Sequence, residues 1–145
     1  MIRDATLDDL TKLVARGALH HEELGFPWSY DERSTAESCA KLIGLGTLLV
    51  EDNLGGYIGY ELGPIYFNHE VILATEHFWY VLPSERGTGL GMALLKAAQD
   101  KAKNQGAHWF GVQLPPQSHE AIDLVENKGF QLMHGIYGVG LWQGQ

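Results

Sequence analysis

Apolar residues recur at helical spacing in the second half of the chain and mark its clearest predicted helix. From Gly89 to Gly106 the apolar positions fall at i, i+3, i+4, i+7 and i+8, with charged residues on the opposite side. Three further helices are predicted from caps and breakers. They cover residues 6–24, opened by Thr6 and stopped by Gly25-Phe26-Pro27, residues 31–43, capped near Ser34 or Thr35, and residues 118–128, capped by Ser118.

Runs rich in β-branched and aromatic residues alternate with these helices and predict six strands. Residues 47–51 and 57–62 flank a turn and are typical of an antiparallel hairpin, which Gly63-Pro64 is expected to bend or end. The predicted strands are residues 2–6, 47–51, 57–62, 71–82, 107–114 and 130–142. The element order predicts an α/β fold built on a mixed sheet, with an antiparallel front half and a βα crossover behind.

The length and composition are those of one folded domain. The chain has 145 residues, 45% of them apolar, which is enough for a single core. It shows no leader-like opening and no run near the ~20 apolar residues of a membrane span. The single cysteine, Cys39, fits a reducing compartment. We therefore expect one domain over residues 1–145, located in the cytoplasm and not bound to a membrane.

The negative charge is concentrated in the first part of the chain. The net charge is −8, and residues 1–85 hold 14 acidic and 5 basic residues whereas residues 86–145 hold 4 and 5. An acidic surface repels nucleic-acid phosphates, so we expect no nucleic-acid partner and a weak preference for a cationic one. The same acids also fit a role in solubility alone.

A glycine-rich turn follows the long predicted strand directly. Arg86-Gly87-Thr88-Gly89-Leu90-Gly91 opens the clearest helix, so free N–H groups and the positive end of the helix dipole point to one place. Such a turn favours a phosphate group, and Arg86 adds a fixed positive charge. Met92 stands where a dinucleotide fingerprint needs glycine, and no Gly-Lys-Ser/Thr follows, so two common nucleotide loops are excluded. A turn that only packs the helix on the sheet is the structural alternative.

In these residues the chain resembles the GNAT family, the Gcn5-related N-acetyltransferases. The hallmark Arg/Gln-x-x-Gly-x-Gly/Ala after a Pro-terminated strand stands here as Arg86-x-x-Gly89-x-Gly91 after Val81-x-Pro83. Three more segments match in order: Ile2-Arg3-Asp4-Ala5-Thr6 with Asp8-Asp9-Leu10, Gly56-x-x-Gly59, and Leu124 to Phe130. The resemblance implies a single domain with a mostly antiparallel, twisted mixed sheet flanked by helices. Its acceptor side would span about residues 1–70 and its acetyl-CoA-binding part about residues 71–130.

The resemblance also implies acetyl-CoA as cosubstrate. In the family the turn amides hold the pyrophosphate and the preceding strand pairs with the pantetheine arm. The implied acetyl-CoA-binding residues are Val81, Leu82, Arg86, Gly87, Thr88, Gly89, Leu90, Gly91, Met92 and Ser118. Two positions depart from the family pattern, because Ser118 replaces a common asparagine and Val125 replaces the tyrosine that protonates the departing thiolate.

Attack on a thioester needs a neutral amine, so a general base is expected. Glu76 lies on the long strand near the position of the catalytic glutamate of some family members, and strand alternation places it on the face of Phe78 and Tyr80, opposite His77. With Val125 unable to donate a proton, Tyr137 on the closing strand is the proposed acid, although a thiolate with a pKa of ~8.5 can leave without one.

The acceptor residues are expected at the end of the first helix and in the aromatic segments. His20, His21 and Glu23 could bind or deprotonate an amine, and Trp28, Tyr30 and Tyr80 could wall an aromatic pocket. A solvated helix end and ordinary core packing are the alternatives. We expect no metal, because no matching ligand set accompanies the histidines.

The sequence thus predicts an N-acetyltransferase that moves an acetyl group from acetyl-CoA to a primary amine, on a small molecule or a peptide, by direct attack in a ternary complex. The alternative is a non-catalytic acyl-CoA-binding sensor or interaction module, which the departures at Ser118 and Val125 favour. The closing strand could also pair with a second copy to form a homodimer.

Overall fold

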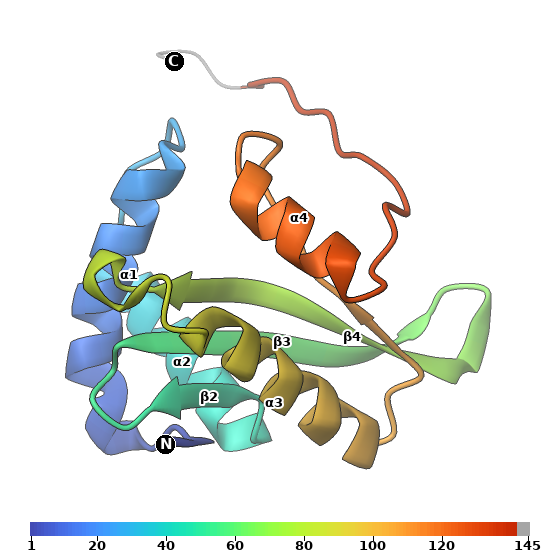
Figure 1. The fold of residues 1–145 in the computed structure, drawn as a ribbon, viewed down its shortest axis with the longest axis horizontal. Helices are drawn as coiled ribbons and strands as arrows, with labels where there is room; N and C mark the ends of the chain where they lie inside the picture. The colour runs from blue at the N-terminus through green and yellow to red at the C-terminus, as the bar shows by residue number, and fades with distance from the viewer. Residues whose placement is uncertain (142–145) are drawn as a thin grey trace.

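One five-stranded sheet organises the chain, and its strands lie in the order β1-β2-β3-β4-β5. In the computed structural model, which describes residues 1–141, neighbouring strands run antiparallel from β1 to β4, and β5 runs parallel to β4 (Figure 1). The strands are β1 (Ile2–Asp4), β2 (Leu48–Glu51), β3 (Gly56–Ile65), β4 (Asn68–Val81) and β5 (Trp109–Gly111). The predicted α/β fold with a mixed, mostly antiparallel sheet is confirmed.

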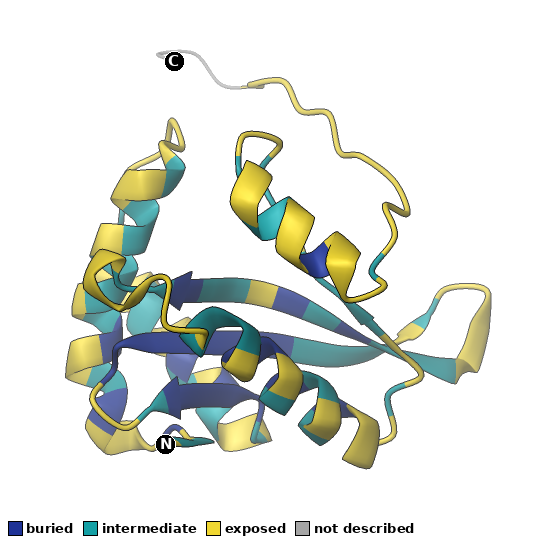
Figure 2. Cartoon of the chain, in the orientation of Figure 1, coloured by how far each residue is buried: buried dark blue, intermediate teal, exposed yellow. Residues whose placement is uncertain are grey.

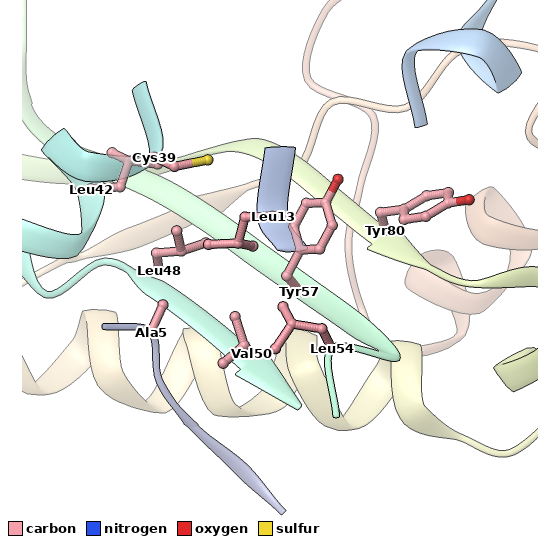
Figure 3. Packing of buried hydrophobic residues seen from close by; sticks show 9 residues of the cluster. All are labelled: Ala5, Leu13, Cys39, Leu42, Leu48, Val50, Leu54, Tyr57 and Tyr80. Carbon is pink, nitrogen blue, oxygen red and sulfur yellow. The ribbon is translucent and has the colours of Figure 1, made fainter. Parts of the chain in front are cut away.

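Helices cover both faces of this sheet and divide the core in two. Helices α1 (Leu10–Leu24) and α2 (Glu32–Leu45) bury a cluster that includes Leu13, Leu42 and Val50 (Figure 3). Helices α3 (Leu90–Asn104) and α4 (His119–Asn127) cover the opposite face, where Ile58, Leu94 and Val125 belong to the second cluster. Buried residues concentrate where the sheet meets these helices (Figure 2). Full burial of one such side chain stabilises the fold by roughly 1.5–3 kcal/mol.

The helix starts follow local capping chemistry. The Thr6 amide donates to Asp9 Oδ2 at 2.8 Å, within a capping box that opens the 3₁₀ turn η1 (Leu7–Asp9) ahead of α1. Helix α2 is capped by Asp31, whose carboxylate accepts from the Ser34 amide at 2.9 Å. The prediction of a cap at Ser34 or Thr35 was therefore wrong, because an acid three residues ahead of Ser34 already satisfies its free amide.

The structure differs from two strand predictions. Of the two outcomes expected at Gly63-Pro64, the strand does not end there, because β3 continues to Ile65, but its register with β4 shifts between Pro64 and Ile65. A proline is tolerated there because β3 has no strand partner on the β2 side beyond Gly59. The closing strand is not formed in residues 130–141, which are irregular and largely exposed. Three glycines in this segment weaken strand formation, and Trp142 lies outside the described residues. The edge on which the expectation of a homodimer rested is therefore not formed here.

None of the helices described in residues 1–141 is both long and apolar enough to span a membrane.

Candidate active site

The glycine turn connects the end of β4 to the start of α3 through the short 3₁₀ helix η2 (Pro83–Glu85). Gly87 and Gly89 have φ values of 82° and 86°, which glycine adopts at little cost and other residues rarely adopt. The N-cap residue Gly89 has no side chain to cap α3, and the Leu90 amide makes only a long contact of 3.4 Å to Thr88 Oγ1, so the first amides of this helix keep most of their hydrogen-bonding capacity. The turn therefore offers an anion site made of main-chain groups and a helix dipole.

The space around these glycines fits a bound group. A Cβ built on Gly87 or Gly89 would meet nothing within 4 Å, and one on Gly91 would come no closer than 3.5 Å, to Val81 Cγ2. Packing inside the protein therefore does not require glycine at position 91. Trp79 holds the turn to the sheet, since its indole N–H donates to the Gly91 carbonyl at 3.0 Å.

Arg86 links this turn to helix α1. Its Nη2 donates to Glu23 Oε2 at 2.7 Å and its Nε donates to the Val81 carbonyl at 3.0 Å. The Tyr80 hydroxyl donates to the other Glu23 oxygen at 3.2 Å, and the Arg86 guanidinium lies 5.6 Å from the centre of the Tyr80 ring. Glu23, Tyr80 and Arg86 thus form one connected group at the C-terminal end of α1.

A β-bulge in β4 places Glu76 on the face that the sequence did not predict. Gly59 pairs with Phe78 but the next residue of β3, Tyr60, pairs with Glu76, so His77 is an extra residue. The bulge inverts the side-chain alternation, because Ala74 and Trp79 both contact the α3 cluster whereas Phe78 contacts the α1–α2 cluster. Glu76 therefore shares the face of Ala74 and does not share that of Phe78 and Tyr80, which corrects the prediction.

The Glu76 carboxylate lies where β4 and β5 separate. The last paired residues of the two strands are Thr75 and Gly111, so the edge of β4 from Glu76 to Val81 has no strand partner on that side. The Gln113 amide donates to Glu76 Oε1 at 3.1 Å. Only 3% of Glu76 is exposed, and this burial raises its pKa to about 7 although the Gln113 amide opposes the shift.

A cavity of about 250 Å³ lies on the opposite face, between α1, α2 and β4. His20 stacks on Tyr80 with ring centres 4.8 Å apart, and burial lowers the pKa of His20 although Glu23 opposes the shift. The lining residues come from both helices, the loop between them and two strands: Leu13, Gly17, His20, His21, Leu24, Phe26, Trp28, Tyr30, Thr35, Cys39, Tyr57, His77 and Phe78.

The structure brings most of the predicted acceptor residues together. His20, His21, Trp28 and Tyr30 line the cavity, while Glu23 and Tyr80 stand beside it in the Arg86 group. Sequence reasoning missed His77 and Phe78 as cavity walls, because the bulge that turns both toward α1 and α2 leaves no signal in the residue types. Cys39 is buried in the wall of this cavity, and burial raises the pKa of its thiol to about 11.

The remaining predicted residues are not gathered at this site. Tyr137 lies in the irregular segment after α4 and is 99% exposed, so the structure does not bring it near Glu76 as a closing strand would have done. Ser118 precedes α4 but its side chain does not cap the helix, and Val125 is buried in the α3 cluster. Within residues 1–141, no three His, Cys, Asp or Glu side chains are gathered as a metal ion would require.

Comparisons with known proteins agree with this geometry. The model of the Acetyltransferase (GNAT) family matches residues 8–130. An L-methionine sulfoximine/L-methionine sulfone acetyltransferase of Pseudomonas aeruginosa is 31% identical, over 96% of this chain and 84% of that protein.

Solved structures share the fold over nearly the whole chain. A transcriptional regulator from Bacillus halodurans has a TM-score of 0.78 at 22% identity, covering 97% of this chain and 99% of that one. A predicted acetyltransferase from Clostridium acetobutylicum, solved with acetyl-CoA, has a TM-score of 0.75 at 19% identity, covering 97% and 96%.

Proposed function

The chain belongs to the GNAT family of acetyltransferases, and from this premise we propose that it passes the acetyl group of acetyl-CoA to a primary amine on a small molecule, by direct attack in a ternary complex. One observation carries the proposal: the anion-binding turn, the unpaired edge of β4 and the aromatic cavity all meet on the last residues of this strand. Acetyl donor and acceptor can therefore approach the same point from different sides.

In this proposal main-chain groups hold most of the coenzyme. The amides from Gly87 to Met92 bind the pyrophosphate at the start of α3, with Thr88 and Leu90 on the same turn. The free edge of β4 up to Val81 and Leu82 pairs with the amides of the pantetheine arm. Arg86 exchanges its bond to Glu23 for the pyrophosphate, and Ser118 stands in for the asparagine of the family pattern.

The chemistry requires an amine without its proton. A lysine-like ammonium with a pKa of ~10.4 costs roughly 4–5 kcal/mol to deprotonate at neutral pH. With a pKa of about 7, Glu76 is a stronger base than an ordinary carboxylate and is still partly ionised at neutral pH. We assign Glu76 as the base. Because Glu76 lies on the face of β4 opposite the cavity, it accepts this proton through a water at the opening between β4 and β5. The neutral His20 in the cavity is the competing assignment.

The bonds change in one sequence. After the ammonium has given its first proton to Glu76, the neutral amine nitrogen attacks the thioester carbonyl carbon and the C–S bond breaks. Coenzyme A leaves as a thiolate, and the second proton of the nitrogen passes to that sulfur or to water. Val125 has no proton to give, and Tyr137 could act as the acid only if the segment after α4 moved toward β4. A thiolate with a pKa of ~8.5 can leave without an acid.

Three further assignments belong to the proposal. Residues 1–145 act as one acetyltransferase domain, in which the acceptor side is about residues 1–70 and the acetyl-CoA part about residues 71–130. The acidic first part disfavours a nucleic-acid partner and the reaction uses no metal. The reducing cytoplasm is the expected location, consistent with a buried, unpaired Cys39.

The release of free coenzyme A tests the function. Purified protein is incubated with acetyl-CoA and a panel of primary amines, and the free thiol is followed with time. We expect release above the amine-free background, with initial-rate lines that intersect when both substrates are varied. Parallel lines would indicate an acetyl-enzyme intermediate and contradict direct attack. Tight acetyl-CoA binding without release from any amine would support the non-catalytic alternative.

A further inference from the structure

The walls of the cavity on the α1–α2 face are mostly aromatic. Tyr57 and Phe78 stand edge to face at 5.4 Å on the sheet side. Phe26 and Trp28 form a second pair at 5.0 Å in the loop between the helices. Such walls favour a flat or apolar group, because its burial removes apolar surface from water and allows ring contacts.

Three histidines line the same cavity, and two of them already have a polar partner in the protein. Burial lowers the pKa of His20, which keeps its ring neutral. His21 Nε2 lies 2.9 Å from the Trp28 carbonyl, which can only accept, so this nitrogen donates to the main chain. His77 Nε2 lies 3.4 Å from Glu61 Oε1 and is therefore already paired with an acid.

The cavity also lacks a fixed cation. No Lys or Arg lines it within residues 1–141. Arg86, beside it, is bound by Glu23 and the Val81 carbonyl, and Arg16 of α1 donates its Nε proton to the Leu54 carbonyl at 3.0 Å. A carboxylate in this cavity would lose part of its hydration without gaining a charged partner, which disfavours its binding.

From these walls and this charge pattern we infer that the acceptor is a small primary amine that carries an aromatic or apolar group and no carboxylate. The inference rests on the proposed acetyl transfer and narrows its substrate class. A volume of about 250 Å³ suits a small monoamine, since sites for drug-sized ligands have ~300–1,000 Å³. The substrate class thus differs from the amino-acid derivatives named for the Pseudomonas relative, which carry an α-carboxylate.

A matched series of amines tests the inference. 2-Phenylethylamine and L-phenylalanine differ by the carboxylate alone, and L-phenylalaninamide keeps its size without its charge. With acetyl-CoA saturating, we expect kcat/KM for 2-phenylethylamine to exceed that for L-phenylalanine at least tenfold, with the amide close to the amine. Equal or better use of L-phenylalanine, or of L-methionine sulfone, would overturn the inference while leaving the acetyl transfer intact.

Calorimetry separates the inference from the proposed function. Each compound is titrated into the protein saturated with coenzyme A, where no turnover occurs. Binding of 2-phenylethylamine at least tenfold tighter than that of L-phenylalanine, without turnover of any amine, would support the substrate class and refute the transfer. Failure of 2-phenylethylamine to bind would refute the substrate class, whatever the protein does with other amines.

Two half-exposed tryptophans supply a matched pair of variants. Trp28 lines the cavity and is 53% exposed, whereas Trp109 on β5 lies outside it and is 49% exposed. Trp28→Ala should raise the KM for 2-phenylethylamine about fivefold or more and that for propylamine by a smaller factor, because the smaller apolar group has less contact with the indole. Trp109→Ala should change neither. Equal effects of the two variants, or an equal loss for both amines in Trp28→Ala, would contradict an aromatic acceptor site.

Discussion

The acetyl-CoA side and the acceptor side of the proposed active site are made of different groups of the protein. On the acetyl-CoA side, the turn from Arg86 to Gly91 presents main-chain amides, and its conformation depends on two glycines with positive φ. On the acceptor side, the cavity is shaped by side chains from α1, α2 and β4. A binding site made of main-chain groups is determined by a short segment of the sequence. A binding site made of side chains depends on how elements that are distant in the sequence pack together. The first side should therefore be specified by few positions and the second by many.

The largest expected effect concerns the main-chain side. Gly89→Glu places a side chain and a negative charge at the start of α3, so acetyl-CoA affinity should fall by at least ~100-fold or become undetectable by calorimetry. Gly91→Glu should have a comparable effect without the cost of a positive φ. Because a Cβ would meet nothing within 4 Å at Gly89 and no atom closer than 3.5 Å at Gly91, the fold should persist in circular dichroism.

Gly106→Glu is the matched control for this change. Gly106 also has a positive φ, 98°, and open space around its Cβ, but it follows the far end of α3. This variant should carry a similar backbone strain, of about 1–3 kcal/mol, and retain acetyl-CoA affinity. Equal loss of affinity in both variants would mean that strain, and not the anion site, explains the effect.

The next effect concerns Glu76, which lies where β4 and β5 separate, on the face of β4 opposite the cavity. Glu76→Gln keeps the size and the bond from Gln113 but removes the base, so kcat should fall by roughly 100-fold while acetyl-CoA affinity stays unchanged. The wild-type rate should rise with pH through about 7, because the base must be ionised, and this limb should vanish in the variant. If Glu76→Gln keeps more than half of the wild-type activity, His20 and not Glu76 would be assigned as the general base. His20→Asn would then test that assignment.

The stability of Glu76→Gln tests the burial of Glu76 independently of enzyme activity. The folded protein holds the Glu76 proton up to about pH 7, whereas the unfolded chain releases it near 4.5. The free energy of unfolding should therefore fall between these pH values, by about 3 kcal/mol from this group. Urea unfolding of Glu76→Gln should lack this decrease. An identical pH dependence in both proteins would show that Glu76 is not buried as described.

Arg86 and Glu23 link the two sides, and substitutions of these residues should have a smaller effect on acetyl-CoA affinity. Arg86→Ala should weaken acetyl-CoA binding about tenfold, because the main-chain amides remain. Glu23→Gln should tighten it up to about fivefold, since a half-exposed ion pair that competes for Arg86 is worth about 0–1 kcal/mol. In Arg86→Ala the Glu23 substitution should have no effect on acetyl-CoA affinity. Weaker binding in Glu23→Gln alone would mean that Glu23 positions Arg86 for the pyrophosphate and does not compete with it.

The same contrast explains what the sequence could predict. The first five strands, the main helices and the glycine turn follow from periodicity and from glycines whose φ values the turn requires. The face of Glu76 was missed because one extra residue, His77, inverts the alternation, and nothing in a β-rich run marks where a bulge falls. The closing strand was expected from apolar residues alone, although its glycines oppose pairing. The cavity walls depend on the packing of α1 against α2, which no local pattern encodes.

The smallest predicted effect probes the packing of the side-chain side. Gly17 lies in the middle of α1, and a Cβ there would stand 2.8 Å from the Tyr30 hydroxyl, which donates to the Val14 carbonyl at 2.6 Å. Gly17→Ala should displace Tyr30 and raise the acceptor KM about threefold, with acetyl-CoA affinity unchanged.

Gly44→Ala in α2 is the control, because its Cβ would meet nothing within 4 Å. It should stabilise the protein by up to about 1 kcal/mol through helix propensity and leave the KM unchanged, whereas in Gly17→Ala the shift of Tyr30 should offset that gain. Thermal unfolding and the acceptor KM, measured on both variants, test whether a shift of Tyr30 affects stability and acceptor binding. If Gly17→Ala gained the full stability of Gly44→Ala and kept its KM, the Tyr30 wall would not shape the acceptor site, and the side-chain half would be less sensitive to packing than its construction implies.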